Sequence, residues 1–463
     1  MPVASLWASH LLAGVAVLAV VDVLADSALA ATLSQWGLAG FLLLGWPRFS
    51  SMARWLALAC VGVSGLALWR LSSPWAVLHE AFGSFVFLAA FMTALALLRL
   101  PAQRSRLIRR CGQSLLMQPP TWRYPMLSLG SMLFGIVLNF GVLNLFLSMI
   151  DKANTLDSAQ GRAWLQRVRR RRMLVATLRG FTLAPLISPL GIGVAVVLGN
   201  LEALSWGELF PYVLASALIL FLLGWACDQV AGPRPSAAST MVAERPSLMP
   251  LAAFSLLLLA LVSLVFALAA GFTLRLPEAV LIGVPVGAWL WLAWQCRGAG
   301  HVGAVGASVV LTRRLPEVLG GIGNEVVALG SGAYLGHLSV ALLDPGQLQE
   351  VATLLVAFGG WLPVSALLLI VVLAQVGLNP IISVTFLTNM VVQVGTEGVS
   401  LPLLAAAMLV GWSLTMVSSP FTAAMMIMSR FTGMTARQVG RGWNGPFLAA
   451  SLATAALLFR LAS

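Results

Sequence analysis

Two asparagines occupy matching places in the two halves of the sequence, each inside an apolar segment without charged residues. Asn139 stands between a leucine and a phenylalanine, and Asn379 stands between a leucine and a proline. An amide side chain offers a carbonyl oxygen to a cation and N–H donors to an anion. The matched positions favour a ligand site over the alternative, in which both are ordinary turn residues. Gly141, Pro380 and Ser383 are candidate members of the same sites.

A Ser-Pro step in each half marks a second pair of candidate sites. Pro189 lies within the apolar segment 174–200, and Pro420 lies within 400–428. Proline lacks an amide hydrogen and clashes with the preceding turn, so we expect each helix to break near the middle of the membrane. Backbone groups freed there are tolerated where they line a cavity or bind a ligand, and a simple kink is the alternative. The neighbouring candidates are Ser188 and Gly191 in the first half and Ser418, Ser419 and Thr422 in the second.

The expected tips and breaks could bind ions of either sign. Freed helix carbonyls suit a cation, whereas helix N-termini suit an anion. Sodium is the ion we expect, with Asn139 and Ser188 at one position and Asn379 and Ser419 at the other. No other metal or cofactor is expected, because the four cysteines and four histidines are dispersed and match no metal or redox spacing.

Three charged side chains in or beside apolar segments have more than one interpretation. Arg179 lies about two turns inside its segment. We expect it to extend back to the membrane interface, with contact to a substrate anion as the alternative. Glu80 and Glu325 are expected at helix starts, where the helix dipole favours a carboxylate. A role in proton coupling is the alternative for these two acids.

The composition defines the environment of these residues. The chain has 463 residues, of which 60% are hydrophobic and only 9% charged, and its mean hydropathy is +0.95. Soluble domains are about 25% charged, so the composition excludes a soluble enzyme, a disordered protein and a nucleic-acid-binding protein. It indicates an integral membrane protein. No Walker A motif is present, which disfavours ATP-driven transport by this chain.

Eleven apolar segments are long enough to cross a bilayer as helices, since a span needs about 20 residues. They are 4–25, 30–47, 55–71, 75–98, 174–200, 205–227, 248–271, 277–296, 318–343, 400–428 and 445–461. No long alternating pattern indicates a barrel. No Lys or Arg precedes the first segment, which favours a retained helix over a signal peptide cleaved within 25–31.

Two further apolar segments are expected to enter and leave the membrane on the same side. Basic clusters flank 125–150, and basic residues stay in the cytoplasm. Acidic residues flank 363–392 instead, and no Lys or Arg occurs from 315 to 429. The flanking acids are Asp344, Glu350 and Glu397. With these re-entrant hairpins the N-terminus is cytoplasmic and the C-terminus periplasmic. Most of the 27 Lys and Arg residues, which produce the net charge of +12, then fall in cytoplasmic loops.

The same features recur in the same order in both halves, and the charge pattern gives the halves opposite orientations. Each half contains a helix with a glutamate, a hairpin opened by an aromatic residue and a proline, an Asn tip, and a helix broken at Ser-Pro. This order predicts an inverted repeat. We divide the chain into scaffold helices (1–98), a cytoplasmic interfacial segment (99–124), a first transport region (125–228), a cytoplasmic linker (229–247), scaffold helices with an outer interfacial segment (248–361, the segment itself near 348–359) and a second transport region (362–463).

This layout resembles the ion transporter superfamily, and within it the divalent anion/sodium symporters. That resemblance implies eleven spans, a homodimer, and a scaffold against which a mobile transport domain moves as an elevator. It also implies ligand sites at Asn139, Ser188–Gly191, Asn379 and Ser418–Thr422. The hairpin tips depart from the Ser-Asn-Thr pattern of those symporters, because only the Asn is present and hydroxyl donors for two carboxylates are missing. Apolar tips suit a less charged or bulkier substrate.

The sequence therefore predicts an all-α, multi-pass secondary transporter in a bacterial-type inner membrane. It would move a small organic or inorganic anion, coupled to sodium or protons, and its partners would be membrane lipids and a second copy of the chain. Arsenite exporters, sodium/proton antiporters and exporters of aminobenzoyl-type compounds belong to the same superfamily, so export of a metalloid or amphipathic compound, or antiport, is the alternative. A membrane-embedded transferase is disfavoured, because few acidic residues are expected at the inner face. A passive channel is disfavoured by the two oppositely oriented hairpins.

Overall fold

The computed structural model describes residues 3–157, 159, 161–231, 247–297, 303–395 and 399–463. Across these residues the chain is helical and contains no strand, as the sequence predicts. Ten helices in the described part are long and apolar enough to cross a membrane, or eleven if the pair α15–α16, bent by 103°, counts as one. The all-α, multi-pass class is confirmed. Most of the predicted linker 229–247, together with Glu397, lies outside the described residues.

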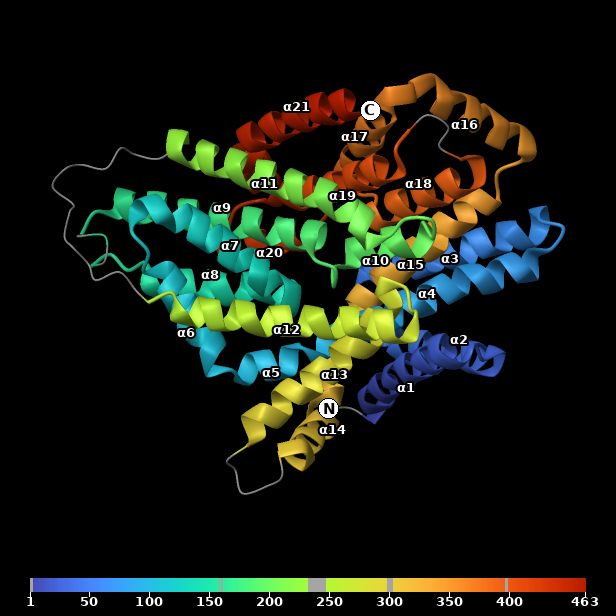
Figure 1. Ribbon diagram of the computed structural model, residues 1–463, viewed down its shortest axis with the longest axis horizontal. Helices are drawn as coiled ribbons and strands as arrows, with labels where there is room; N and C mark the ends of the chain where they lie inside the picture. The colour runs from blue at the N-terminus through green and yellow to red at the C-terminus, as the bar shows by residue number, and fades with distance from the viewer. Residues whose placement is uncertain (1–2, 158, 160, 232–246, 298–302, 396–398) are drawn as a thin grey trace.

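Figure 1 shows the arrangement of the helices. They are α1 (Val3–Ala25), α2 (Ala28–Gly45), α3 (Ser51–Arg70), α4 (Pro74–Leu97), α5 (Arg99–Arg104), α6 (Arg106–Leu116), α7 (Pro120–Leu138), α8 (Gly141–Ala153), α9 (Ala163–Ile187), α10 (Ile192–Asn200), α11 (Trp206–Ala231), α12 (Met249–Phe272), α13 (Leu276–Cys296), α14 (Gly303–Gly320), α15 (Gly323–Ala341), α16 (Pro345–Phe358), α17 (Leu362–Gln375), α18 (Pro380–Val394), α19 (Leu401–Ser418), α20 (Ala423–Thr432) and α21 (Asn444–Ala462). A π-helix covers Gln438–Trp443.

Both predicted hairpins are helix pairs that turn at the two asparagines. α7 and α8 are joined by Asn139 and Phe140, and α17 and α18 by 376–379. At 1.5 Å per residue, the 13 residues of α8, 14 of α17 and 15 of α18 are too short to span about 30 Å. The first hairpin begins a few residues earlier than predicted, because Pro120 opens α7.

Both predicted helix breaks are present as well. α9 ends at Ile187 and α10 begins at Ile192, so the Ser188–Gly191 segment is not helical. In the second half α19 ends at Ser418 and α20 begins at Ala423. The proline chemistry therefore predicts the breaks correctly. The first broken helix begins earlier than predicted, since α9 starts at Ala163 and includes the run of four arginines.

In each half, one glycine allows the hairpin to approach the first part of the broken helix closely. Gly180 in α9 lies so near the Ser128 backbone of α7 that any side chain there would collide. In the second half, a Cβ at Gly411 in α19 would lie 3.1 Å from the Leu367 carbonyl oxygen of α17. Small residues permit such close helix packing where lipid provides no hydrophobic drive. The repeat is therefore visible in the packing as well as in the order of elements.

The two broken helices form the centre of the molecule. Every residue of α19 from Leu403 to Ser418 is buried, and so is the part of α9 from Met173 to Ala184. Ser413 of α19 donates a hydrogen bond to the Thr182 carbonyl oxygen of α9, at 2.7 Å, and ties the halves together. By contrast, α2 and α3 expose large apolar side chains such as Trp36 and Trp55, as expected for helices that face lipid.

Two sequence expectations differ from the structure. Residues 297–317 were expected to be a loop, yet α14 occupies most of them and packs against α13 and α1. Its apolar residues are interrupted by Arg313 and Arg314, which hides its helical character in a hydropathy profile. Glu80 was expected at a helix start, but α4 begins at Pro74 and Glu80 lies in its second turn. A helix, α16, is present at the position near 348–359 where the sequence predicts one.

Candidate functional site

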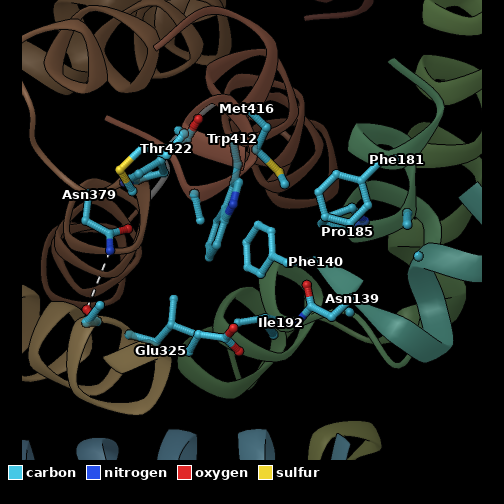
Figure 2. Close-up of a pocket in the computed structure, with 18 of the residues that line it drawn as sticks. Asn139, Phe140, Phe181, Pro185, Ile192, Glu325, Asn379, Trp412, Met416 and Thr422 are labelled. Carbon is cyan, nitrogen blue, oxygen red and sulfur yellow. Dashed lines mark hydrogen bonds between the residues drawn. The ribbon is translucent and has the colours of Figure 1, made fainter. Parts of the chain in front are cut away.

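A cavity of about 260 Å³ lies where the two hairpin tips meet the two helix breaks (Figure 2). Asn139 and Asn379 contribute one tip each, and the breaks contribute Ser188 and Ser419. Residues of α3 and of the first turns of α15 line another side of the cavity. The structure thus brings the sites predicted from the two halves together into one place.

Eight helix ends converge on this cavity. The N-termini of α8, α10, α18 and α20 and the C-termini of α7, α9, α17 and α19 all lie at the tips or breaks whose residues line it. Helix N-termini carry partial positive charge and unpaired N–H groups, and C-termini carry partial negative charge and unpaired carbonyls. The cavity can therefore stabilise an anion and a cation without a charged side chain for each.

In the first half, fewer of the polar groups are bonded. Asn139 adopts φ +49° with ψ −134°, outside the left-handed helical region, and within the described residues its side-chain amide has no hydrogen-bond partner. Gly191 is the N-cap residue of α10 and offers no side-chain cap. Ser188 Oγ accepts a bond from the Leu190 N–H at 3.2 Å, and the Gly191 N–H donates to the Ser188 carbonyl at 2.8 Å. The side-chain amide of Asn139 and the N-terminus of α10 are thus available to a ligand.

In the second half, the equivalent side chains are bonded to backbone groups of the protein. Asn379 caps α18 by accepting from the Ile381 N–H at 3.1 Å, and its amide donates to the Ala328 carbonyl at 3.5 Å. Ser419 donates to the Ala374 carbonyl of α17 at 2.6 Å. Thr422 caps α20 by accepting from the Met425 N–H at 3.4 Å. This half is therefore largely satisfied without a ligand.

Several aromatic and sulfur-containing side chains line the cavity (Figure 2). Phe140 and Phe181 lie with ring centroids 5.5 Å apart, while Trp412 and Met416 of α19 face them across the cavity. Phe421 and Met426 complete this wall beside the second break. Sequence analysis missed these residues, because an aromatic residue in an apolar helix has no distinguishing pattern.

The wall opposite the breaks belongs to α3 and α15. Asn324 accepts a hydrogen bond from the Ser50 backbone N–H at 2.7 Å and so joins the starts of these helices. Glu325, in the first turn of α15 as predicted, lines the cavity, and its Oε2 lies 3.1 Å from Arg99 Nη2. Glu325 is the one ionisable side chain among the described residues that line the cavity. The position of Glu325 at a helix start could be predicted from the sequence, but its place in the cavity wall could not.

The remaining predicted residues divide into two groups. Residues that line the cavity are Asn139, Ser188, Gly191, Asn379, Pro380, Ser419 and Thr422. Residues beside it but not among its described lining are Gly141, Pro189, Ser383, Ser418 and Pro420. Ser418 accepts a bond from the Gln375 side chain at 3.1 Å, and Ser383 Oγ is buried in α18 without a hydrogen-bond partner in the described structure.

Arg179 was expected to extend back towards the membrane interface, but its side chain is buried among other helices, and it is not among the described residues that line the cavity. Its side chain is buried in α9, where the guanidinium donates to Asn444 Oδ1 at 2.9 Å and to the Gly224 carbonyl at 3.2 Å. The guanidinium also stacks over the Phe447 ring at 4.4 Å. These partners come from α11 and α21 and satisfy the charge internally, so the side chain need not extend towards water.

Comparison with known proteins finds a similar fold but no matching family. No family model and no curated protein matches the chain. Among solved structures, the chain is similar to the YdaH transporter of Alcanivorax borkumensis, whose crystal structure is described as having an unusual topology. The TM-score is 0.53 at 14% sequence identity, over 88% of this chain and 97% of that chain. The chain therefore shares its overall fold with that protein. At this identity, the likeness concerns the fold alone.

Proposed function

We propose that the protein is a secondary active transporter of small organic anions that have an apolar body. The observation that supports this proposal is the single cavity formed by both tips and both breaks, with eight helix ends around an aromatic wall. The free N-terminus of α10 and the Asn139 amide are suited to an anionic head group, and the aromatic wall is suited to the rest of the molecule. A dianion without an apolar part is a poorer fit.

Coupling to a cation follows from the other helix ends. The C-termini of α7, α9, α17 and α19 present carbonyl oxygens where an anion would be held nearby. Sodium at Asn139/Ser188 and at Asn379/Ser419 would use these carbonyls, with the Asn and Ser oxygens as further ligands. The alternative is proton coupling, which requires an ionisable side chain in the cavity.

Alternating access in this proposal is a movement of the hairpins and broken helices along α15, as an elevator. The hairpin arm α18 packs closely on α15, where a Cβ at Gly332 would lie 2.8 Å from Ile381 Cγ2 and one at Gly336 would lie 2.6 Å from Thr385 Cβ. Glycines leave α15 smooth on this side, so α18 can shift along it. We place the N-terminus in the cytoplasm and the C-terminus outside, in an inner membrane, with the chain as a homodimer.

The aromatic wall favours a second candidate, export of an amphipathic compound with little charge. Such a compound would occupy the same cavity, with Asn139 bonded to a neutral polar group. The two candidates differ in whether a charged head group is required for binding. A measurement of the direction of transport would distinguish the two candidate functions further.

A ligand screen by thermal shift tests the proposed function. Purified protein is heated with benzoate, benzenesulfonate, succinate or arsenite, with sodium or potassium and at several pH values. A ligand of the folded state raises the melting temperature. We expect benzoate and benzenesulfonate to stabilise more than succinate, and proteoliposomes to accumulate labelled benzenesulfonate under a sodium or proton gradient. Stabilisation by none of the organic anions, with no accumulation, would refute the proposal.

A further inference from the structure

We propose that Glu325 is the proton-coupling residue of this cavity, taking up a proton when an organic anion binds and releasing it when the anion leaves. The proposal rests on the function proposed above. It is carried by the Arg99–Glu325 ion pair, which lies at the start of α15 on the wall opposite the helix breaks. Arg99 is the first residue of α5, shortly after α4 ends at Leu97, so the pair joins the start of α5 to the start of α15.

The ion pair is a single contact at the edge of the cavity. One guanidinium nitrogen of Arg99 donates to one carboxylate oxygen of Glu325 at 3.1 Å, and no second contact between these two groups occurs. The Glu325 side chain is 27% exposed and the Arg99 side chain is 19% exposed. Both groups are therefore largely removed from solvent, yet the carboxylate still faces the space in which a ligand would lie (Figure 2).

Charge balance in this enclosed space links the anion to the proton. With the cavity empty, Arg99 and Glu325 neutralise each other. An organic anion adds a negative charge close to the Glu325 carboxylate, and two like charges in a poorly solvated site cannot both persist without cost. A proton from solvent that bonds to a Glu325 oxygen removes this cost and leaves the Arg99 charge to balance the anion. The proton returns to solvent when the anion leaves, and the ion pair forms again.

Other ionisable groups on the neighbouring helices are directed elsewhere. α18 has none. On α3, the guanidinium of Arg54 donates to the Trp46 and Pro47 carbonyls, and the Cys60 thiol faces the Ser331 carbonyl. On α4, His79 and Glu80 lie about 30 Å from Arg99, from the rise of the helix. Arg99 is thus the charged partner of Glu325 within the described residues.

Isothermal titration calorimetry with benzenesulfonate measures the coupling directly. A sulfonate stays ionised at neutral pH, so any proton taken up must bond to the protein. Titrations of the full-length protein in two buffers with different ionisation enthalpies give the number of protons bound per ligand. We expect about one proton for the wild-type protein and none for Glu325→Gln, which keeps the shape of the side chain. Glu80→Gln is the matched control and should keep the wild-type uptake, because Glu80 is exposed and remote from the cavity.

A double variant separates coupling from a purely structural ion pair. Arg99→Gln combined with Glu325→Gln removes both charges and leaves neither partner alone in the protein interior. We expect this variant to fold, to bind benzenesulfonate about tenfold more weakly than Glu325→Gln, and to take up no proton. Equal proton uptake by the wild type and Glu325→Gln would overturn the proposal while leaving the transport function intact. Wild-type protein that binds none of the organic anions would instead contradict the proposed function itself.

Discussion

The two halves of the cavity have the same elements but treat their polar groups differently. At the second break and tip, Asn379, Ser419 and Thr422 each bind a backbone group of the protein. At the first, the Asn139 side-chain amide has no partner in the described structure, and the N-cap residue of α10, Gly191, has no side chain to cap the helix. An inverted repeat thus supplies two similar half-sites, of which one is already satisfied.

This difference assigns different roles to the two halves. Buried or half-buried polar groups without partners are costly, and proteins retain them where a ligand completes their bonding. The first half therefore fits direct contact with the ligand. The second half fits the role of an internal support, in which Asn379 caps α18 and Ser419 holds α17 against the end of α19. Variants in the first half should change binding, and variants in the second half should mainly change stability.

Removal of the Asn139 amide should have the largest effect. Asn139→Gly is the informative change, because glycine accepts the φ of +49° that would strain alanine. The loss of a hydrogen bond to a charged group costs about 1.5–3 kcal/mol, so affinity for benzenesulfonate should fall roughly 10- to 100-fold. The melting temperature without ligand should not fall. Asn139→Asp, which keeps the shape but places a carboxylate at the tip, should bind more weakly still. Unchanged affinity in both variants would remove Asn139 from the site.

Displacing the start of α10 should weaken binding next most strongly. In Gly191→Ala, the new Cβ would lie 2.9 Å from the Ser188 carbonyl oxygen and 3.2 Å from the Pro185 carbonyl oxygen, so the backbone must shift. The amides at the helix N-terminus would then point away from the ligand position. We expect a loss of affinity of about tenfold, equivalent to about 1.4 kcal/mol.

The same helix provides the control for this change. Gly199→Ala places a Cβ near the far end of α10, where nothing lies within 4 Å. This variant should bind like the wild type, measured by calorimetry on protein of equal thermal stability. If Gly191→Ala and Gly199→Ala lose affinity equally, the effect comes from the helix as a whole and not from its N-terminus.

Asn379→Ala should show the reverse balance between stability and binding. It removes the cap of α18, which is worth about 0.5–2 kcal/mol, together with the long bond to Ala328 on α15. The melting temperature should fall, whereas the affinity for benzenesulfonate should fall less than in Asn139→Gly. Asn379→Ser restores a capping oxygen and should recover most of the stability. A larger binding loss at Asn379 than at Asn139 would invert the assignment of the two halves.

The elements of the cavity could be predicted from sequence where a residue type carries its own constraint. Proline disfavours a continuous helix, and the Ser-Pro steps at Pro189 and Pro420 coincide with the breaks, although α9 continues through Pro185. Basic clusters cannot easily cross a membrane, so they locate the first hairpin. Each of these signals is local and requires no knowledge of packing.

The walls of the cavity could not be predicted, because they depend on packing between distant segments. Trp412 and Phe181 line the same cavity only because α19 and α9 pack together, and both look like ordinary apolar residues in their helices. Glu325 similarly joins the site through contacts of α15 with α4 and α18. Arg179 was misplaced for the same reason, since its partner Asn444 is 265 residues away.

The smallest expected effect is at Thr422, whose cap of α20 is long at 3.4 Å. Thr422→Ala should lower stability by about 0.5–1 kcal/mol, because one N–H at the start of α20 loses its acceptor. Thr422→Ser keeps the hydroxyl and should match the wild type. Thr422 lines the cavity, so its hydroxyl is close to a ligand, yet the cap already occupies an oxygen lone pair. We therefore expect affinity for benzenesulfonate to change less than about threefold, or about 0.6 kcal/mol. A tenfold loss in Thr422→Ala, with Thr422→Ser unaffected, would mean that the second half also contacts the ligand and that the two halves share its recognition.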